Sequence, residues 1–240
     1  MKPKKGVHII NAHYVTPENS AEIDIEIFEN FLKNITKKAK LISLKEALQL
    51  IEKGKENIND VYVTLTFDDG FEECYSTIAP LIEKYGSTGA FFINANYIES
   101  DINYQEKFNE RTQTYTKKPM SWAQVIDLHH RGHLIGSHNL DHTNMSELDD
   151  EDLDFQLKHN KKILENKLNY TCDYFAWTYG QMQHFPERAL IATLKYHDYI
   201  FSGTDYKNYF SRNNKVINRR HIEPFWNKYH MNYFLSVNKQ

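Results

Sequence analysis

The chain has 240 residues, 40% of them hydrophobic and 25% charged, which is the composition of one folded globular domain and excludes a disordered or repetitive protein. Its 29 Lys and Arg residues against 32 Asp and Glu give a net charge of -3, so there is no overall positive field to hold a nucleic-acid backbone. No stretch approaches the roughly 18 apolar residues that a membrane span requires.

Short β-rich runs alternate with amphipathic helical stretches, and this alternation predicts parallel strands joined by helical crossovers. The first apolar run, residues 7–10, is too short for a signal peptide, so we expect a cytoplasmic protein unless a targeting segment precedes this sequence. No repeat or Pro/Gly/Ser linker divides the chain, so we expect a single domain over residues 1–240. Seven strands are predicted, at residues 6–11, 61–67, 89–94, 133–137, 173–177, 199–202 and 216–220.

Capping residues mark the helices between these strands. Two capping-box patterns predict helix starts, Ser43 with Glu46 and Ser121 with Gln124. Pro80 should interrupt or restart the helix that follows the strand at 61–67. The two cysteines, Cys74 and Cys172, lack CxxC spacing and the density of a disulfide scaffold, so we expect both to be reduced and buried.

The stretch 96–119 interrupts the alternation, because it is polar, rich in aromatic residues and without clean periodicity. A connection of this length inside a compact domain is usually a functional lid or disordered. We predict that Tyr104, Phe108, Tyr115 and Trp122 belong to a mobile wall over the functional cleft. The alternative is a loop packed flat against the side of the sheet.

Two adjacent aspartates, Asp68 and Asp69, follow the strand predicted at 61–67 and precede Gly70. Neighbouring strand residues point to opposite faces, so both carboxylates can serve one site only where the strand ends and the backbone turns. Gly70 permits such a turn, and α/β folds build their sites at the carboxyl ends of parallel strands. The alternative is a helix-capping aspartate with a solvated neighbour.

Two histidines, His138 and His142, follow the strand predicted at 133–137. On a helical turn they would lie on one face, about 5 to 6 Å apart, where both imidazoles can reach one metal ion. We therefore expect a helical turn here, with Asp69 or Asp68 completing a set of two histidines and one carboxylate. The alternative is two surface or capping histidines in a chain that holds twelve.

The segment 175–180, with the sequence FAWTYG, runs from a predicted strand into a loop that ends in glycine. Aromatic walls with free backbone N–H groups suit a sugar-binding cleft and contact with an oxyanion. Core packing alone would explain Phe175 fully and Trp177 in part.

In this order and at these separations, the segments 66–70, 138–142 and 175–180 resemble the NodB-homology polysaccharide deacetylases, carbohydrate esterase family 4. The likeness extends over most of the chain, from His13 and Tyr14 to the strand that ends at Arg220. It implies a distorted (β/α)7 barrel, one divalent metal ion for which zinc is expected, and hydrolysis of N-acetyl groups on an amino sugar in a polysaccharide or glycan precursor.

Residue roles follow from the resemblance by position in the motifs. Asp69, His138 and His142 would bind the metal, and Asp68 would act as the general base. Tyr179 would offer its backbone N–H to the oxyanion.

The chain also departs from the family. Asn139 stands where Ser or Thr usually follows the first histidine, and Ala176 where an arginine commonly pairs with the catalytic base. Arg219 or Arg220 could supply that charge from the last strand, although we expect at least one of the two to be solvated at the surface.

The family's late motifs, which supply the general acid, have no clear match. We predict that His221 protonates the leaving amine, because it follows the last predicted strand and Glu223 could orient its ring. His184 and His197 are less suitable, since each lies beside a predicted helix end.

A non-catalytic carbohydrate-binding protein on the same fold is the alternative function, because the arginine and the acid motif are missing. The four intact Asp and His residues favour the enzyme. A glycosidase needs two carboxylates about 5 to 9.5 Å apart across a sugar ring, which adjacent aspartates cannot easily provide. The zinc nucleobase deaminase signature, His-x-Glu with Cys-x-x-Cys, is absent from the sequence.

Overall fold

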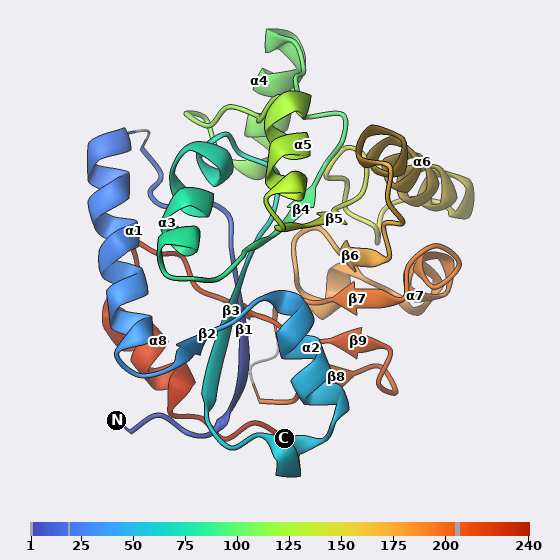
Figure 1. The fold of residues 1–240 in the computed structure, drawn as a ribbon. Coiled ribbons are helices and arrows are strands. Elements are labelled where there is room, and N and C mark those ends of the chain that lie inside the picture. The colour runs from blue at the N-terminus through green and yellow to red at the C-terminus, as the bar shows by residue number, and fades with distance from the viewer. Residues whose placement is uncertain (1, 19, 205–206) are drawn as a thin grey trace.

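The structure, a computed structural model of the chain, describes residues 2–18, 20–204 and 207–240. Its centre is a curled sheet whose strands follow the order β10-β1-β3-β4-β5-β6-β7-β9-β8, with β2 paired to β3 off this path. Neighbouring strands run parallel throughout the described ladder except for β8 with β9. Helices surround the curled sheet (Figure 1). This architecture confirms the predicted α/β fold of the distorted-barrel type.

The strands are β1 Gly6–Ala12, β2 Lys40–Leu41, β3 Val61–Phe67, β4 Ala90–Ile93, β5 Leu134–Ser137, β6 Tyr174–Ala176, β7 Tyr199–Phe201, β8 Phe210–Ser211, β9 Val216–Ile217 and β10 Arg220–His221. The α-helices are α1 Ala21–Thr36, α2 Leu44–Glu52, α3 Ala79–Lys84, α4 Ile102–Thr112, α5 Trp122–His130, α6 Asp150–Leu168, α7 Glu187–Thr193 and α8 Lys228–Leu235. Short 3-10 turns lie at Lys55–Asn57 and Met182–His184, and a π-helical turn at Cys74–Ile78.

The prediction of one strand at 216–220 is wrong, because the chain forms two short strands there. β9 pairs with β7, whereas β10 pairs with β1 at the other end of the strand order. A single straight strand cannot reach both partners, so Asn218 and Arg219 carry the chain from one edge of the sheet to the other. Arg219 is thereby placed where the curled sheet closes.

Helix signals in the sequence are confirmed. Ser43 and Ser121 both form complete capping boxes at the starts of α2 and α5. Pro80 lies in the first turn of α3, directly after the π-helical turn, where its missing N–H costs no hydrogen bond. Cys74 and Cys172 are buried and unpaired, as expected.

The stretch 96–119 is more regular than predicted. Asp101 caps α4 by accepting a hydrogen bond from the Tyr104 backbone N–H, and Phe108 anchors the helix with a buried ring. The expectation of an irregular connection missed this helix because a single buried ring leaves almost no 3.6-residue periodicity. Figure 1 shows α4 at the top of the molecule, next to α5.

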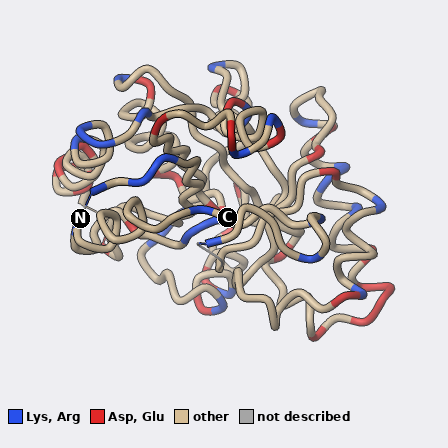
Figure 2. Tube along the Cα trace, turned by 90° about the horizontal axis from the view of Figure 1, so that it is seen from below, with Lys and Arg blue, Asp and Glu red and all other residues tan. Residues whose placement is uncertain are grey.

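The apolar core lies on both faces of the curled sheet. Ile10 and Leu65 point toward the surrounding helices, whereas Val7, Ile9 and Phe92 pack inside the curl, which α2 covers at one end. In the view of Figure 2, basic and acidic residues are both spread over the chain. Among the described residues, no helix combines the length and the hydropathy that crossing a bilayer requires.

Candidate active site and metal centre

A cleft of about 740 Å³ opens at the carboxyl ends of the parallel strands. Strand β3 delivers the two aspartates to this cleft, β5 the two histidines, and β6 the loop that holds Tyr179. The sequence-predicted residues therefore converge on one place, as the strand polarity requires. They line the cleft together with residues that sequence reasoning did not place there, among them Asn11, His13, Arg111, Thr114 and Gly203.

Asp68 and Asp69 serve one site because the backbone turns between them. The Asp68 N–H still donates to the Ala12 carbonyl as a continuation of the β1–β3 ladder, while Asp69 adopts a left-handed φ of 76°. Gly70 follows with a φ of 88°, a conformation that favours glycine. Both carboxylates are buried in the cleft wall and face different partners.

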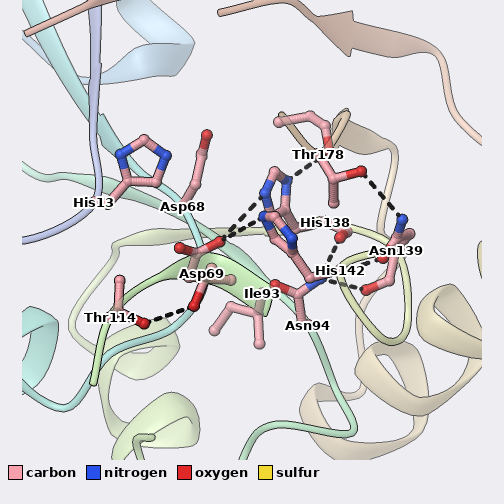
Figure 3. A network of polar contacts seen from close by, with 12 residues as sticks. His13, Asp68, Asp69, Ile93, Asn94, Thr114, His138, Asn139, His142 and Thr178 are labelled. Atoms are coloured by element: carbon pink, nitrogen blue, oxygen red, sulfur yellow. Dashed lines mark hydrogen bonds and ion pairs between the residues drawn. The ribbon is translucent and has the colours of Figure 1, made fainter. Parts of the chain in front are cut away.

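Asp69, His138 and His142 form a group that could hold a metal ion. The Nε2 atoms of His138 and His142 lie 3.4 and 3.3 Å from Oδ1 of Asp69. Within the described chain, that buried oxygen has no partner in hydrogen-bonding geometry, so the three donor atoms face a common point without satisfying one another (Figure 3). One carboxylate oxygen and two imidazole nitrogens suit zinc and similar divalent ions, so the residues fit the expected metal.

The neighbours of these three side chains determine which of their atoms are free to bind a cation. The Nδ1 atom of His138 lies 2.7 Å from the Ala176 carbonyl, which fixes Nδ1 as the protonated nitrogen and leaves the Nε2 lone pair free. Burial lowers the pKa of His142 to about 4, so this ring is neutral at pH 7. Burial raises the pKa of Asp69, but the neighbouring histidines outweigh that effect and hold the pKa well below its usual range. All three groups are thus suited to bind a cation.

The prediction of a helical turn at 138–142 is wrong. Asn139 and His142 have left-handed φ values of 51° and 54°, and the segment is an irregular bend. The Asn139 side chain stabilises the bend by donating to the Thr143 carbonyl at 3.0 Å, and Asn94 donates to the carbonyl of Asn139. The ring centres of His138 and His142 are still 5.2 Å apart, so the bend brings the two imidazoles as close together as the predicted helical turn would have done.

Asp68 is held by a buried arginine. Arg219 donates through both terminal nitrogens, Nη1 to Oδ1 and Nη2 to Oδ2, each at 2.7 Å. Burial raises the pKa of Asp68, but the guanidinium of Arg219 and the nearby His138 outweigh it and lower the pKa below its usual value. The charge missing at Ala176 is therefore supplied by Arg219.

The expectation that Arg219 or Arg220 would be solvated is wrong, since both are buried. Arg220 donates to the Phe234 carbonyl and lies over the Phe234 ring, so it packs against α8 and not in the site.

Tyr179 lines the same cleft as the aspartates, with its ring centre 5.0 Å from that of His142. Tyr179 and Gly180 have consecutive left-handed φ values of 62° and 63°, and the Gly180 backbone packs against Gly203. In the described part of the chain, the Tyr179 N–H donates no backbone hydrogen bond. This arrangement leaves the amide available to a ligand in the cleft.

His221 lines the cleft, but it shares its carboxylate with a second histidine. Nε2 of His221 and Nδ1 of His13 lie 2.7 and 2.6 Å from the same oxygen of Glu223. Burial lowers the pKa of His13, but Glu223 raises it more, with smaller contributions from Asp69 and Asp68, and the pKa reaches about 9. The pKa of Glu223 falls to about 2, since the two histidines outweigh its burial.

The two His/carboxylate groups differ in a way that separates their roles. His13, His221 and Glu223 could also hold a metal by their spacing. Their contacts, however, have the length of charge-assisted hydrogen bonds, whereas the contacts around Asp69 are longer than such bonds. The first group suits proton storage and the second suits a cation.

The aromatic residues predicted to form a wall over the cleft do not line it. Phe108 is buried against Tyr97, Trp122 packs at the start of α5, and Tyr115 is exposed. The insertion contributes residues 111–114 to the cleft instead. Tyr104 turns toward the bend that carries the histidines, through a hydrogen bond to Asp141.

Sequence reasoning missed the role of His13. It lies 210 residues from Glu223, and β1 and β10 become neighbours only because the sheet curls. The usable signal was its position just after the first predicted strand, since the carboxyl ends of all parallel strands meet at the same mouth. Arg219 was named as one of two candidates, and only the closure of the sheet distinguishes it from Arg220.

A sequence model of the family described as polysaccharide deacetylase matches residues 55–198, which is more than half of the chain. The chain belongs to the polysaccharide deacetylase family. Membership confirms the resemblance to the NodB-homology polysaccharide deacetylases.

Two curated relatives and two solved structures illustrate the likeness. YxkH of Bacillus subtilis is 23% identical over 181 residues, and a chitin deacetylase of Arthroderma benhamiae is 27% identical over 154 residues; these matches cover 75% and 61% of this chain. The chain spans 58% and 35% of the lengths of these two relatives.

The fold is shared with solved structures. The Streptococcus pyogenes deacetylase PplD, solved with acetate, superposes with a TM-score of 0.74 at 15% identity, covering 98% of this chain and 99% of that one. IcaB from Ammonifex degensii superposes with a TM-score of 0.70 at 17% identity, covering 92% and 94%.

Proposed function

We propose that this deacetylase is a metal-dependent hydrolase that removes N-acetyl groups from an amino sugar in a polysaccharide or glycan precursor. One observation carries the proposal: three ligands converge on a point in the cleft, and a fourth group, Asp68, stands beside them with a different partner. Figure 3 shows Asp68 next to Asp69 and outside the group of ligands.

Asp69, His138 and His142 would hold the ion, for which zinc suits two imidazoles and one carboxylate. When bound, such an ion acts as a Lewis acid on an acetyl carbonyl and lowers the pKa of water. The chain supports this chemistry by burying the ligands and by keeping His142 neutral at pH 7.

Asp68 would accept the proton of the attacking water. Its lowered pKa keeps it ionised at neutral pH, and each oxygen retains a lone pair beside its bond to Arg219. The Tyr179 N–H, in the same cleft, would donate to the oxyanion of the tetrahedral intermediate.

The proton for the leaving amine would come from the group made by His13, Glu223 and His221. His221 was the sequence-predicted donor, and its side chain is 40% exposed. His13 is the better donor in this geometry, because Figure 3 shows it beside Asp68 and its pKa of about 9 keeps it protonated at pH 7. His221 would then help to hold Glu223 in place.

A non-catalytic carbohydrate-binding role is less well supported. Its motivation was the missing arginine at Ala176 together with the missing acid motif. Arg219 takes the place of that arginine toward Asp68, and His13 and His221 lie in the cleft as candidate acids. A protein without catalytic function has no need to hold a carboxylate and a buried guanidinium beside the ligand group.

Acetate release tests the proposal. Purified protein is stripped of metal with a chelator, reloaded with zinc, and incubated with a panel of N-acetylated monosaccharides, oligosaccharides and polysaccharides. Release from at least one substrate by the reloaded protein only, with loss on repeated stripping, is the expected result. Binding of a glycan without acetate release in any metal state would contradict it and favour the binding protein.

A further inference from the structure

We propose that the insertion 96–119 positions the metal ligand His142 through Asp141, so that it belongs to the metal centre and is not a lid over the substrate. This inference rests on the metal site of the proposed function. Asp141 lies in the bend between the two histidines and directly precedes His142. Its side chain faces away from the cleft, toward the insertion and α6, through the contacts described next.

Three side chains of the insertion hold Asp141. The Tyr104 hydroxyl donates to Oδ1 at 2.5 Å, and Nδ2 of Asn96 donates to the same oxygen at 2.8 Å. Arg111 donates to the Asp141 backbone carbonyl. The insertion thus grips both the side chain and the backbone of this residue.

The body of the protein grips the same residue from the other side. Gln156 on α6 donates to Oδ2 of Asp141 at 2.7 Å and accepts from the backbone N–H groups of Leu140 and Asp141 at 3.1 and 3.0 Å. Asp141 therefore joins the insertion and α6 across the bend. Both ends of that bend are metal ligands.

The insertion also reaches the ligands directly. The Phe108 ring packs edge-on against the His142 ring, with 5.8 Å between the ring centres, and it also stacks on the ring of Tyr97. Figure 3 shows Thr114, at the end of the insertion, pointing toward Asp69. A ring contact with one ligand and a side chain that points toward a second are difficult to reconcile with a lid that serves only the substrate.

His142 needs such support because its backbone is left-handed, with φ of 54°. This conformation is unfavourable for a residue with a β-carbon and persists where the surroundings impose it. Residues behind metal ligands orient them, and their loss typically costs about 10- to 100-fold in metal affinity. We therefore expect the contacts to Asp141 to set the zinc affinity of the site.

The test compares two substitutions of the same kind within the insertion. Tyr104→Phe removes the hydroxyl bound to Asp141, whereas Tyr115→Phe removes a hydroxyl from a residue that is 73% exposed. Zinc dissociation constants are measured on the full chain by competition with a chromophoric chelator. Tyr104→Phe should bind zinc about tenfold more weakly than wild type, and Tyr115→Phe should match wild type.

Asp141→Asn should have a larger effect, because the new NH2 group would face the NH2 group of Gln156, and two donors cannot form a hydrogen bond. We expect it to weaken zinc binding by about 10- to 100-fold. In both variants, excess zinc should restore kcat while KM for the glycan stays close to wild type. If Asp141→Asn does not fold, the zinc affinity of Tyr104→Phe, compared with that of Tyr115→Phe, tests the inference by itself.

Wild-type zinc affinity in Tyr104→Phe and in folded Asp141→Asn would overturn the inference and leave the proposed function standing. An equal loss in Tyr115→Phe would also overturn it, since the effect would not pass through Asp141. A wild-type protein that binds no divalent metal would remove the proposed function and this inference together.

Discussion

Asp68 and Asp69 are neighbours in sequence, but the structure gives them opposite surroundings. Asp68 faces the cation of Arg219 through two hydrogen bonds of 2.7 Å, one to each of its oxygens, and each oxygen keeps a second lone pair. Asp69 faces two imidazole nitrogens at 3.3 and 3.4 Å without completed hydrogen bonds. The negative charge of Asp68 is already balanced by Arg219, whereas that of Asp69 is not. A cation would therefore bind at Asp69 and leave Asp68 free for proton transfer.

Substitution of each aspartate separates these roles. Asp68→Asn should retain about one zinc ion per chain, measured by elemental analysis, and lose acetate release, because an amide cannot accept the proton of water. Asp69→Asn should lose the zinc itself. Circular dichroism must show that both variants fold, since Asp68→Asn leaves the buried Arg219 cation without its carboxylate. The reverse pattern of zinc retention would mean that the two roles are exchanged.

The proton donor can be identified with two kinds of substrate. His13→Gln should lower kcat on an N-acetyl amide by about 10² to 10⁴ and leave an activated acetyl ester nearly unaffected, because only the amine leaving group needs a proton. His221→Gln should have a smaller effect on the amide, since His221 acts on Glu223. A larger loss in His221→Gln than in His13→Gln would restore the donor predicted from the sequence.

At the scale of the elements, the site depends on how the curled sheet closes. β9 and β10 lie at different places in the strand order, and Arg219 stands between them. Besides Asp68, its guanidinium donates to the hydroxyl of Thr66 on β3 and to the carbonyl of Ser202 after β7. One buried side chain therefore ties the closing segment to two distant strands and to the proposed base.

Removal of that side chain should destabilise the fold. Arg219→Met leaves the buried carboxylate of Asp68 without its partner, and the free energy of unfolding in urea should fall by about 3 to 5 kcal/mol. Adding Asp68→Asn to Arg219→Met should recover part of the loss, because the stranded charge is removed with it. Purely additive effects of the two substitutions would show that the ion pair does not couple the elements.

For the whole molecule, features that depend on neighbouring residues in the sequence could be predicted. Features that arise only when the curled sheet closes could not. Strand periodicity located most of the sheet, and capping boxes located the starts of α2 and α5. The common direction of the parallel strands predicted that Asp68, Asp69, His138 and His142 would line one cleft. The bend at 138–142 could not be predicted, because the left-handed backbone of His142 depends on contacts from other elements. The partnership of His13 with Glu223 depends on β1 meeting β10, which no local pattern encodes.

Two buried histidines outside the site should make the whole molecule sensitive to acid. Burial, assisted by Lys161, lowers the pKa of His197 from 6.5 to about 3, and burial, with Arg220 and Lys239, does the same for His8. Each is neutral in the folded chain, while the unfolded chain takes up a proton below pH 6.5. Stability is therefore unaffected above that pH and is lost as the pH falls from 6.5 toward 3.

His197→Phe tests this linkage at one of the two positions. The imidazole is stacked on Phe175 and lies 3.0 Å from the Cys172 carbonyl, which also accepts from Lys161 at 2.8 Å, so a phenyl ring keeps the stacking and leaves the carbonyl a partner. Between pH 6 and pH 5 the wild type should lose about 1.2 kcal/mol more unfolding free energy than the variant, because one proton fewer binds to the unfolded variant. Urea titrations of both proteins at constant ionic strength measure the difference. Between pH 7 and pH 8 the unfolding free energies of the two proteins should change with pH in parallel, and differ only by a constant due to the substitution. Parallel curves down to pH 5 would mean that His197 takes up its proton in the folded state, and that the acid sensitivity of the molecule has another origin.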